Sequence, residues 1–462
     1  MPDQGSGQGG RVRGSGVWGR RSISRLRRAG TERPALNRPT QRLAAVLPIV
    51  AGTIGNVIEW YDFAVYAYFA PTIGTLFFPS DIPNRSLLLS FGVFGVGFFM
   101  RPLGGLFFGH YGDTRGRRNA LAATVILMGA STFVIGILPP YGRIGILAPL
   151  ALLGLRLAQG FSAGGEWAGV AAFLVEYAPP GRRGLTGSWQ QVSVGAGFLA
   201  GSAVATLLTS TLTTETLTAW GWRLPFLFGL VIALVGLYLR LGLADTPRFR
   251  ALEESGQVAR APITEAFSAH RRGLLTVVGF TLSGTVAYYV FLAYFPTYVS
   301  AVLNLPVREA ALINTIGLAV FIVLIPFAGA LSDHVGRKPL LLAHAAGCAI
   351  LGYPLFRLME ATRSFWVILA AQLVGITLEA LFSGPAPAAY SEIFPTRIRY
   401  TAISVPYNLA VAAFGGTAPF IATYLVGATG NRLSFTFYLV AAGLVSFLVY
   451  LTLTETYRTD LR

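Results

Sequence analysis

Gly109 to Arg118 reads GHYGDTRGRR and lies between two long apolar runs of the chain. A near copy, GALSDHVGRK, occupies Gly329 to Lys338, 220 residues further on. Residues that recur at the same offsets are Gly109, Asp113, Gly116, Arg117 and Arg118 in the first copy, and Gly329, Asp333, Gly336, Arg337 and Lys338 in the second. A second echo matches Glu176 and Pro179 with Glu392 and Pro395, at an offset of 216. Two marks at nearly equal offsets indicate one duplicated unit.

The composition is that of a polytopic membrane protein. The 462 residues are 53% hydrophobic and 12% charged, with a mean hydropathy of +0.59, whereas about a quarter of the residues of a soluble domain are charged. The apolar runs are continuous and long enough for helices of roughly 20 residues, unlike the alternating segments of about ten residues that form a β-barrel. We therefore expect helical spans.

Twelve apolar runs are expected to cross the membrane, in two sets of six. They lie at about 44–70, 87–108, 119–139, 145–175, 186–210 and 221–243, and then at about 273–297, 309–331, 339–359, 365–390, 400–426 and 433–453. The predicted fold is an all-α integral membrane protein made of two pseudo-symmetric six-helix bundles. The predicted segments are an N-terminal bundle (44–243), a cytoplasmic linker (244–272), a C-terminal bundle (273–455) and a short cytoplasmic tail (456–462).

The formal net charge of +16 is better explained by membrane orientation than by a nucleic-acid partner. Ten arginines fall in residues 1–43, a stretch expected to be a disordered basic cytoplasmic tail. In the remaining loops, the side that we assign to the cytoplasm holds fourteen Lys or Arg residues and the opposite side at most seven. This bias predicts a multi-pass cell-membrane protein with both termini inside. The lone Cys348 excludes an intramolecular disulfide, and no metal-site spacing is present.

Several stretches at matching places resemble the major facilitator superfamily. Besides the two loop motifs, these are GNVIEWYDFAVYAYFAPTIGTLFFP (55–79), RPLGGLFFGHYGD (101–113), RLAQGFSAGGEWAG (156–169), ADTPRF (244–249) and YSEIFPTRIRYT (390–401). They are most similar to the metabolite:proton symporters, which include carriers of 2-oxoglutarate, citrate, shikimate and proline or betaine. Over roughly residues 44–455, the resemblance implies alternating-access symport of a proton with a small carboxylate-bearing metabolite. It also implies a functional monomer that uses the proton gradient and needs no cofactor.

The loop motif has a physical rationale as a gating latch. Glycine at Gly112 or Gly116 permits a tight turn, Asp113 can lie at the N-terminus of a neighbouring helix, and the arginines can reach a carboxylate such as Glu176. In the superfamily this network holds the cytoplasmic side closed, which the resemblance implies here. The residues assigned to the latch are Arg101, Gly109, Asp113, Gly116, Arg117, Arg118, Glu166, Glu176, Asp333, Arg337, Lys338, Glu392 and Arg397. Within this set, Glu166 could pair with Arg101 at a similar depth.

Charged residues inside the spans are candidates for function because they are costly in lipid. Glu59 and Asp62 lie near mid-depth of the first span, and Arg156 lies at a similar depth of the fourth. Protonation of a carboxylate paired with Arg156 would free the arginine to hold a substrate anion, so we expect Glu59 or Asp62 to couple the proton. A static ion pair that only fixes packing is the alternative. Glu379 is the candidate in the second half.

The cavity is expected among the first, fourth, fifth, seventh, tenth and eleventh spans. The predicted substrate-binding residues are Arg156, Gln159, Tyr66, Asn56, Gln190, Gln191, Tyr288, Tyr289 and Asn408. By contrast, Trp60 and Trp167 are expected to be packing or interfacial anchors.

Other functions remain open at this point. A membrane enzyme would need a catalytic motif such as H-E-x-x-H, a phosphate-binding loop or C-x-x-C, and the sequence contains none of these. A non-transporting sensor is a further possibility from another class. Among transporters, a drug exporter or a sugar carrier is the alternative, although the segment LTETYR (453–458) departs from the tail motif of sugar carriers. The residues do not separate a di- or tricarboxylate cargo from a zwitterion.

Overall fold

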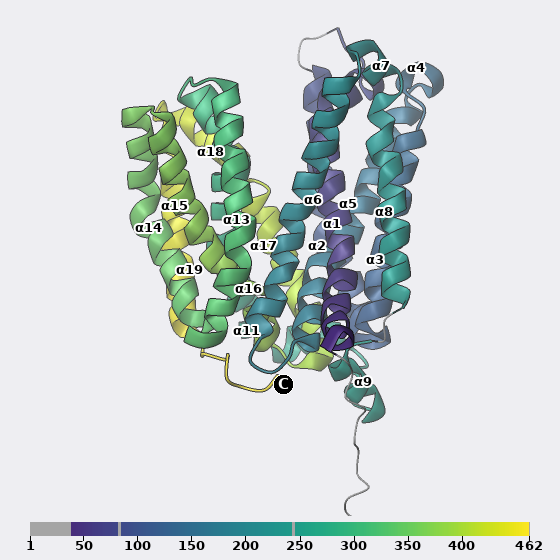
Figure 1. Ribbon diagram of the computed structural model, residues 1–462, viewed down its shortest axis with the longest axis vertical. Coiled ribbons are helices and arrows are strands. Elements are labelled where there is room, and N and C mark those ends of the chain that lie inside the picture. Colours follow the sequence, from purple (N-terminus) through teal and green to yellow (C-terminus); the bar gives the residue numbers. More distant parts are fainter. Residues whose placement is uncertain (1–37, 82–84, 243–244, 462) are drawn as a thin grey trace, which may run out of the picture. The chain divides into compact units, whose positions relative to one another are not determined.

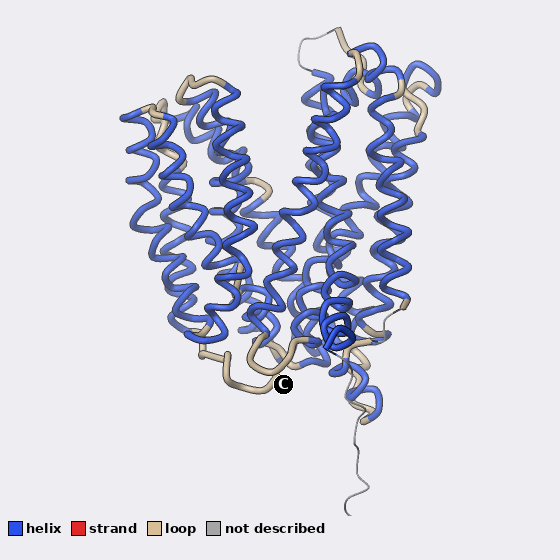
Figure 2. Tube along the Cα trace, in the orientation of Figure 1, coloured by secondary structure: helices blue, strands red, loops and turns tan. Residues whose placement is uncertain are grey.

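A computed structural model gives the structure of residues 38–81, 85–242 and 245–461. These residues form helices and connecting loops only, and no strand occurs among them (Figure 2). The described residues from Leu47 onward form one compact unit. The predicted disordered tail, 1–43, lies outside the described residues except for 38–43, which begin the first helix.

The first half of the chain forms six long helices. They are α1 (Arg38–Phe77), α2 (Arg85–Arg115), α3 (Arg117–Ile137), α5 (Leu147–Tyr177), α6 (Arg183–Thr211) and α8 (Leu224–Leu241), with the short elements α4 (Tyr141–Ile144), α7 (Thr214–Ala219) and η1 (Gly221–Arg223) between them. Two small helices, α9 (Pro247–Glu254) and α10 (Pro262–Ala269), follow in the predicted linker. The hydroxyl of Thr246 accepts a hydrogen bond from the Phe249 amide and so caps α9.

The second half repeats the pattern with more interruptions. Its spans are α11 (Arg271–Tyr288), which continues through η2 (Tyr289–Tyr294), α12 (Phe295–Thr297) and η3 (Tyr298–Val302); α13 (Val307–Val335); α14 (Arg337–Thr362); α15 (Phe365–Ser383) with α16 (Ala386–Ile393); η4 (Thr396–Ile398) and α17 (Arg399–Ala410), which continue through η5 (Val411–Gly415) and α18 (Ala418–Thr429); and α19 (Thr436–Thr452). In Figure 1, α13, α14, α15, α18 and α19 gather beside the group formed by α1, α3, α5, α6 and α8.

All twelve predicted runs coincide with these long helical segments. Nine helical segments of the described chain meet the length and composition of a membrane span, and α19 is a shorter apolar helix. The remaining two, α1 and α5, are long enough but carry Glu59, Asp62, Arg156 and Glu166. The protein is therefore an all-α, multi-pass membrane protein, as the sequence predicts.

The first loop motif, Gly109 to Arg118, is almost entirely helical. The helix α2 ends at Arg115 and α3 begins at Arg117, so Gly116 alone joins them, with a φ of 99°. Gly336 joins α13 and α14 in the same way, with a φ of 105°. Only glycine adopts this conformation without strain. The predicted turn thus depends on Gly116, whereas Gly112 is helical and closely approaches the Tyr400 ring.

Glycines also set the spacing between α2 and α5. A Cβ atom added at Gly104 or Gly164 would collide with the backbone of the facing helix, and Gly97 and Gly160 meet in the same way. Small residues let membrane helices pack with their backbones close together. The crossing fixes where α2 and α5 present their polar side chains.

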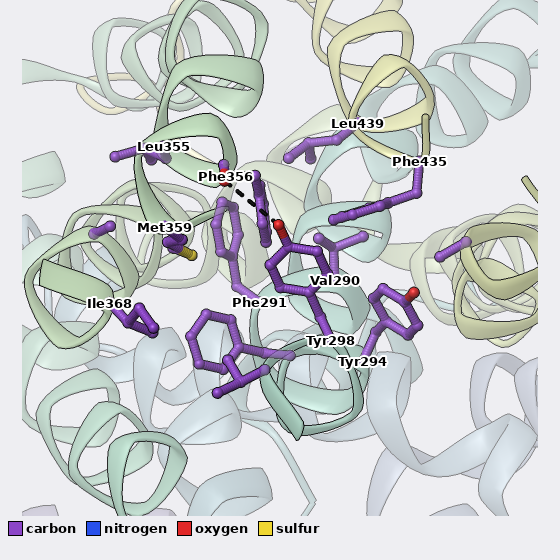
Figure 3. Close-up of a cluster of buried hydrophobic side chains, with 14 of the residues drawn as sticks. Val290, Phe291, Tyr294, Tyr298, Leu355, Phe356, Met359, Ile368, Phe435 and Leu439 are labelled. Carbon is purple, nitrogen blue, oxygen red and sulfur yellow. Dashed lines mark hydrogen bonds between the residues drawn. The ribbon is translucent and has the colours of Figure 1, made fainter. Parts of the chain in front are cut away.

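An aromatic core holds the interrupted helix of the second half in place (Figure 3). The Phe291 ring stacks on Phe356 with centroids 5.5 Å apart, and the Tyr298 ring meets Phe356 edge-on at 5.1 Å. The Tyr298 hydroxyl also donates to the Phe356 carbonyl over 3.4 Å. This core anchors the π-helical stretch that begins at Tyr289 and thereby positions Tyr288 and Tyr289.

Candidate functional site

The two loop motifs join the two halves of the chain at one end of the helices, which we call the motif end. The Asp113 carboxylate accepts hydrogen bonds from the amides of Tyr400 (3.2 Å) and Thr401 (2.8 Å), at the N-terminus of α17. It also forms an ion pair of 2.6 Å with Arg117. A carboxylate is favourable at a helix N-terminus because free amides and the helix dipole both face it. Asp113 of the first half therefore caps a helix of the second.

The second copy makes the reciprocal contact. Asp333 accepts hydrogen bonds from the amides of Gly184 (2.8 Å) and Leu185 (2.9 Å), in the first turn of α6. Arg337 pairs with Asp333 at 2.8 Å. The predicted location of Asp113 at a neighbouring helix terminus thus agrees with the geometry in both copies.

Two glutamates extend this network across the same interface. Glu176 lies 3.5 Å from Arg117 and 2.8 Å from Arg399. Its counterpart Glu392 pairs with Arg337 (3.2 Å) and Arg183 (3.1 Å). Arg397, which the sequence assigned to this network, instead pairs with Glu265 at the surface, at 2.7 Å, and half of its side chain is exposed. Arg399 occupies the central position, because α17 starts there and turns its guanidinium inward.

Two carboxylates that the sequence analysis missed complete the network. Asp245 accepts hydrogen bonds from the amides of Arg117 (3.2 Å) and Arg118 (3.3 Å), and the adjacent Thr246 hydroxyl donates to Glu176 over 2.5 Å. Burial raises the pKa of Asp245, although the Thr246 amide and the Arg117 guanidinium oppose that change.

Glu455 and Thr456 repeat these contacts in the second half. Glu455 accepts from the amides of Arg337 (3.0 Å) and Lys338 (2.9 Å), and the Thr456 hydroxyl donates to Glu392 over 2.6 Å. A sequence signal existed, because Asp245-Thr246 and Glu455-Thr456 are a third repeated pair. The Lys338 ammonium itself donates to the carbonyls of Leu451 and Leu453.

Asp62 and Arg156 form a closed network inside the first half. Their ion pair measures 2.6 Å, and Arg156 also donates to Gln159 over 2.6 Å. Thr132 donates to Asp62, and Gln159 donates to Thr132. The Tyr66 ring lies 3.7 Å from the Arg156 guanidinium. These neighbours engage Arg156 through Nη1, while its Nε and Nη2 make no hydrogen bond.

Glu59 pairs with a different arginine from the predicted one. Arg101 Nη2 lies 3.0 Å from Glu59 Oε1, and each side chain is 1% exposed. Arg101 Nε donates to Asn408 Oδ1 over 3.3 Å, which ties α2 to α17. The predicted pair of Glu166 with Arg101 is absent, because Arg240 of α8 binds Glu166 at 2.5 Å. Matching depth did not reveal which way each side chain points.

A small cavity with about 40 Å³ of water-accessible space lies between the two sets of helices. It is lined by Trp60, Arg101, Trp167, Gln191, Val194, Thr281, Gly284, Thr285, Tyr288, Tyr289, Glu379, Phe382, Tyr407 and Val411. Of the predicted substrate-binding residues, Gln191, Tyr288 and Tyr289 line it. Arg156, Gln159, Tyr66, Asn56, Gln190 and Asn408 are not among its lining residues. Trp60 and Trp167, predicted to be packing anchors, do line it. Of the three π-helical stretches in the described chain, two begin at its wall, with Tyr289 and Val411.

Several buried polar atoms at this cavity have hydrogen-bonding capacity to spare. Within the described part of the chain, Arg101 Nη1, Trp60 Nε1 and Glu379 Oε2 make no hydrogen bond. Arg101 and Glu379 are each only 1% exposed. Buried polar groups in proteins are normally satisfied. These atoms are therefore suited to receive a polar ligand.

The cavity is closed toward the motif end by contacts between the two halves. The Trp167 and Tyr407 rings stack with centroids 4.0 Å apart and planes 15° apart. Trp167 Nε1 donates to Gln191 Oε1 (3.0 Å), Gln191 Nε2 donates to Ser383 Oγ (3.1 Å), and Ser383 Oγ donates to Glu379 Oε1 (2.9 Å). This chain of hydrogen bonds ends on the unpaired carboxylate. Among the described residues, no cluster of three His, Cys, Asp or Glu side chains could hold a metal ion.

Two six-helix sets around a central cavity with buried charged residues in its wall, joined by reciprocal charged motifs, define a membrane transport protein. The chain belongs to the Major Facilitator Superfamily, whose family profile matches residues 52–406 and 304–462. It is 37% identical over 423 residues to the glycine betaine/proline/ectoine/pipecolic acid transporter OusA of Dickeya dadantii. It is 36% identical over 423 residues to the proline/betaine transporter of Escherichia coli strain K12. Each alignment covers 90% of this chain and 84% of the relative. These relatives are named as transporters, and the protein belongs to a transporter family rather than to a family of enzymes.

Solved structures confirm the fold. The proton:xylose symporter XylE bound to 6-bromo-6-deoxy-D-glucose superposes with a TM-score of 0.75, at 20% identity, over 89% of this chain and 96% of that one. The inward-open form of the xylose transporter XylE from E. coli gives a lower TM-score of 0.60, at 22% identity, over 88% and 96% of the two chains. The backbone therefore matches the sugar-bound form more closely than the inward-open one.

Proposed function

We propose that this protein takes up a small zwitterion together with a proton, as a cell-membrane transporter that works by alternating access. The observation that carries the proposal is the placement of Arg101 and Glu379 in one cavity. They come from opposite halves, both are buried, and both have hydrogen-bonding atoms to spare. A ligand with a carboxylate at one end and an ammonium group at the other complements this pair. The printed names of the relatives, proline and betaine transporters, describe such molecules.

Charge complementarity separates this ligand from the alternatives. A di- or tricarboxylate would satisfy Arg101 but would place a second negative charge near Glu379, where desolvation strengthens repulsion. A neutral sugar would leave both buried charges without a partner of opposite sign, at a cost that hydroxyl groups only partly offset. A zwitterion neutralises both ends at once.

Proton coupling follows from the pairing of Glu59 with Arg101. While Glu59 is ionised, Arg101 is already neutralised by a carboxylate 3.0 Å away. Protonation of Glu59 removes that charge and leaves Arg101 in need of a counter-ion. The substrate carboxylate then replaces Glu59 as the partner of Arg101. Proton and substrate consequently bind together, which is the requirement for symport. Asp62 is less suited to this role because its partner Arg156 does not line the cavity.

The motif-end network supplies the gate in this proposal. Asp113 and Asp333 each hold a helix terminus of the opposite half, so these contacts must break when the cavity opens at that end. The excess of basic residues in the loops at the motif end supports a cytoplasmic location for that end. The pseudo-symmetric division at residues 44–243 and 273–455 then supplies the two rocking bodies of a functional monomer in the lipid bilayer.

Transport by purified protein in lipid vesicles tests the proposal. Labelled glycine betaine and proline should accumulate when an inward proton gradient is imposed and should not accumulate when it is collapsed. In Glu59→Gln, accumulation should be lost while exchange of labelled for unlabelled substrate continues, because Arg101 stays free for the substrate. The exposed Glu215 provides a matched control, and Glu215→Gln should behave as wild type. Accumulation of citrate or 2-oxoglutarate in place of both zwitterions would refute the substrate class.

A further inference from the structure

Glu379 lacks the partner that every other buried carboxylate considered above possesses. Asp62, Glu59, Glu166 and Glu176 each pair with an arginine. In the part of the chain that the structure describes, Glu379 has only the Ser383 hydroxyl on Oε1, and Oε2 has no hydrogen-bond partner. An unpaired buried carboxylate is costly. A ligand cation can reach Glu379 from the cavity that it lines.

Aromatic rings line the same cavity as this carboxylate. Tyr288 packs against Phe321 with centroids 6.1 Å apart, in the same cluster as Ile376 and Ala380 of α15, which flank Glu379 in the sequence. Tyr288 meets Tyr289 edge-on at 5.6 Å. Trp167 and Tyr407 line the same cavity and form the stack that closes it. Ring faces attract cations, including those without N–H groups.

The opposite side of the cavity repels a cation. Arg101 is itself positively charged, and its guanidinium lies 5.9 Å from the Trp60 ring centroid and 5.6 Å from that of Phe98. The aromatic groups on that side therefore already have a cation beside them. A zwitterion is oriented with its carboxylate toward Arg101 and its ammonium group toward Glu379.

We infer that Glu379 with the rings of Trp167, Tyr288 and Tyr407 forms a subsite for the ammonium group of the substrate, and that these rings select methylated ammonium over primary ammonium. The inference rests on the proposed zwitterion transport, and it assigns the substrate specificity of that transport to the three rings. Each N-methyl group adds apolar surface that packs on the rings and spreads the positive charge over it. A primary ammonium needs several hydrogen-bond acceptors, and Glu379 Oε2 is the free charged acceptor on this wall.

A methylation series measures this preference directly. Equilibrium binding of glycine, N-methylglycine, N,N-dimethylglycine and glycine betaine to the purified protein should tighten at each step. Trp167→Leu and Tyr288→Leu should each weaken glycine betaine binding about tenfold, within the range of a desolvated cation–π contact, and should change glycine binding about threefold or less. Glu379→Gln should weaken all four ligands by a similar factor of at least about tenfold, because the charge attracts every ammonium.

Matched variants separate the ring from its hydrogen bond and from the fold. Trp167→Phe removes the hydrogen bond to Gln191 but keeps an aromatic ring. Because the ring is retained, the methylation preference should persist. Trp366 is 73% exposed and Tyr424 is 64% exposed, so Trp366→Leu and Tyr424→Leu should bind as wild type. If wild type binds the series without a methylation preference, or if Trp167→Leu and Tyr288→Leu retain it, the subsite is wrong while zwitterion binding stands. If none of the four ligands or proline binds and a dicarboxylate does, the proposed function itself fails.

Discussion

Glu59 and Arg101 form an ion pair at the wall of the central cavity, with Arg101 Nη2 3.0 Å from Glu59 Oε1. Arg101 is also held by Asn408 of α17 through its Nε atom. Asn408 and Glu59 thus hold Arg101 through Nε and Nη2, and Nη1 is available to a ligand. The protonation state of Glu59 determines whether Arg101 needs the substrate carboxylate as its counter-ion.

The first prediction concerns the pH dependence of substrate binding. Since the substrate carboxylate competes with ionised Glu59 for Arg101, the affinity for glycine betaine should rise as the pH falls. The slope should approach about tenfold per pH unit where Glu59 titrates, as linkage to one proton requires. In Glu59→Gln the affinity should be high and nearly independent of pH. Isothermal titration calorimetry at several pH values measures both, and an unchanged slope in Glu59→Gln would remove Glu59 from coupling.

The second prediction concerns the latch. Asp113→Asn should slow uptake and favour opening of the motif end, because two amides and Arg117 lose their anionic partner. Ser188 is fully buried where α6 passes Gly329, so a cysteine at this position, with Cys348 replaced by alanine, reports opening. Its alkylation should accelerate about tenfold or more in Asp113→Asn. Asp333→Asn should have a smaller effect, because Asp333 is less buried than Asp113. Normal uptake and normal alkylation in Asp113→Asn would contradict the latch.

The architecture was predictable because lipid imposes a strong constraint on sequence. Each span needs about 20 apolar residues whose backbone groups are satisfied within a helix, and all twelve runs satisfied this requirement. The ends were less predictable. The helix α1 continues to Phe77, and α2 runs through most of GHYGDTRGRR to Arg115, because a single glycine in the left-handed region suffices to separate two helices.

The sequence predicted the depth of each charged residue in the membrane, but not the direction in which its side chain points from the helix. Glu59 and Asp62 are one turn apart on α1, yet they point about 60° apart around the helix axis. That difference sends Glu59 to Arg101 and Asp62 to Arg156. The direction depends on how α1 is rotated against α2 and α5, which the glycine contacts between helices determine. The prediction that Trp167 is a packing or interfacial anchor was wrong for a different reason. A tryptophan at the membrane interface and a tryptophan in a cavity wall have the same sequence signature.

The third prediction separates a structural pair from a substrate site. Asp62→Asn should lower the free energy of unfolding by about 3–5 kcal/mol, because it leaves Arg156 buried without an anion. Substrate affinity of the folded protein should change less than about threefold. Arg101→Gln should do the reverse, with a loss of substrate affinity of about a hundredfold. Its change in stability should be smaller because the Glu59 carboxylate left without a partner can take up a proton, whereas a guanidinium cannot lose one. Thermal melting without ligand and equilibrium binding distinguish the two. A loss of binding in Asp62→Asn at normal stability would instead support substrate contact by Arg156.

The fourth prediction concerns the carboxylates that follow each set of six helices. Asp245 and Glu455 cap α3 and α14, which belong to their own halves, whereas Asp113 and Asp333 cap helices of the opposite half. Asp245→Ala and Glu455→Ala should therefore each lower the free energy of unfolding by about 1 kcal/mol, the usual cost of a lost cap.

Neither change should alter alkylation of the cysteine at position 188 by more than about twofold. Thr213 caps the short helix α7 with its hydroxyl, so Thr213→Ala supplies a cap deletion away from the motif end. If Asp245→Ala accelerates alkylation as strongly as Asp113→Asn, the cap of α3 belongs to the gate. In that case Thr246, through its bond to Glu176, is the route by which the two are coupled.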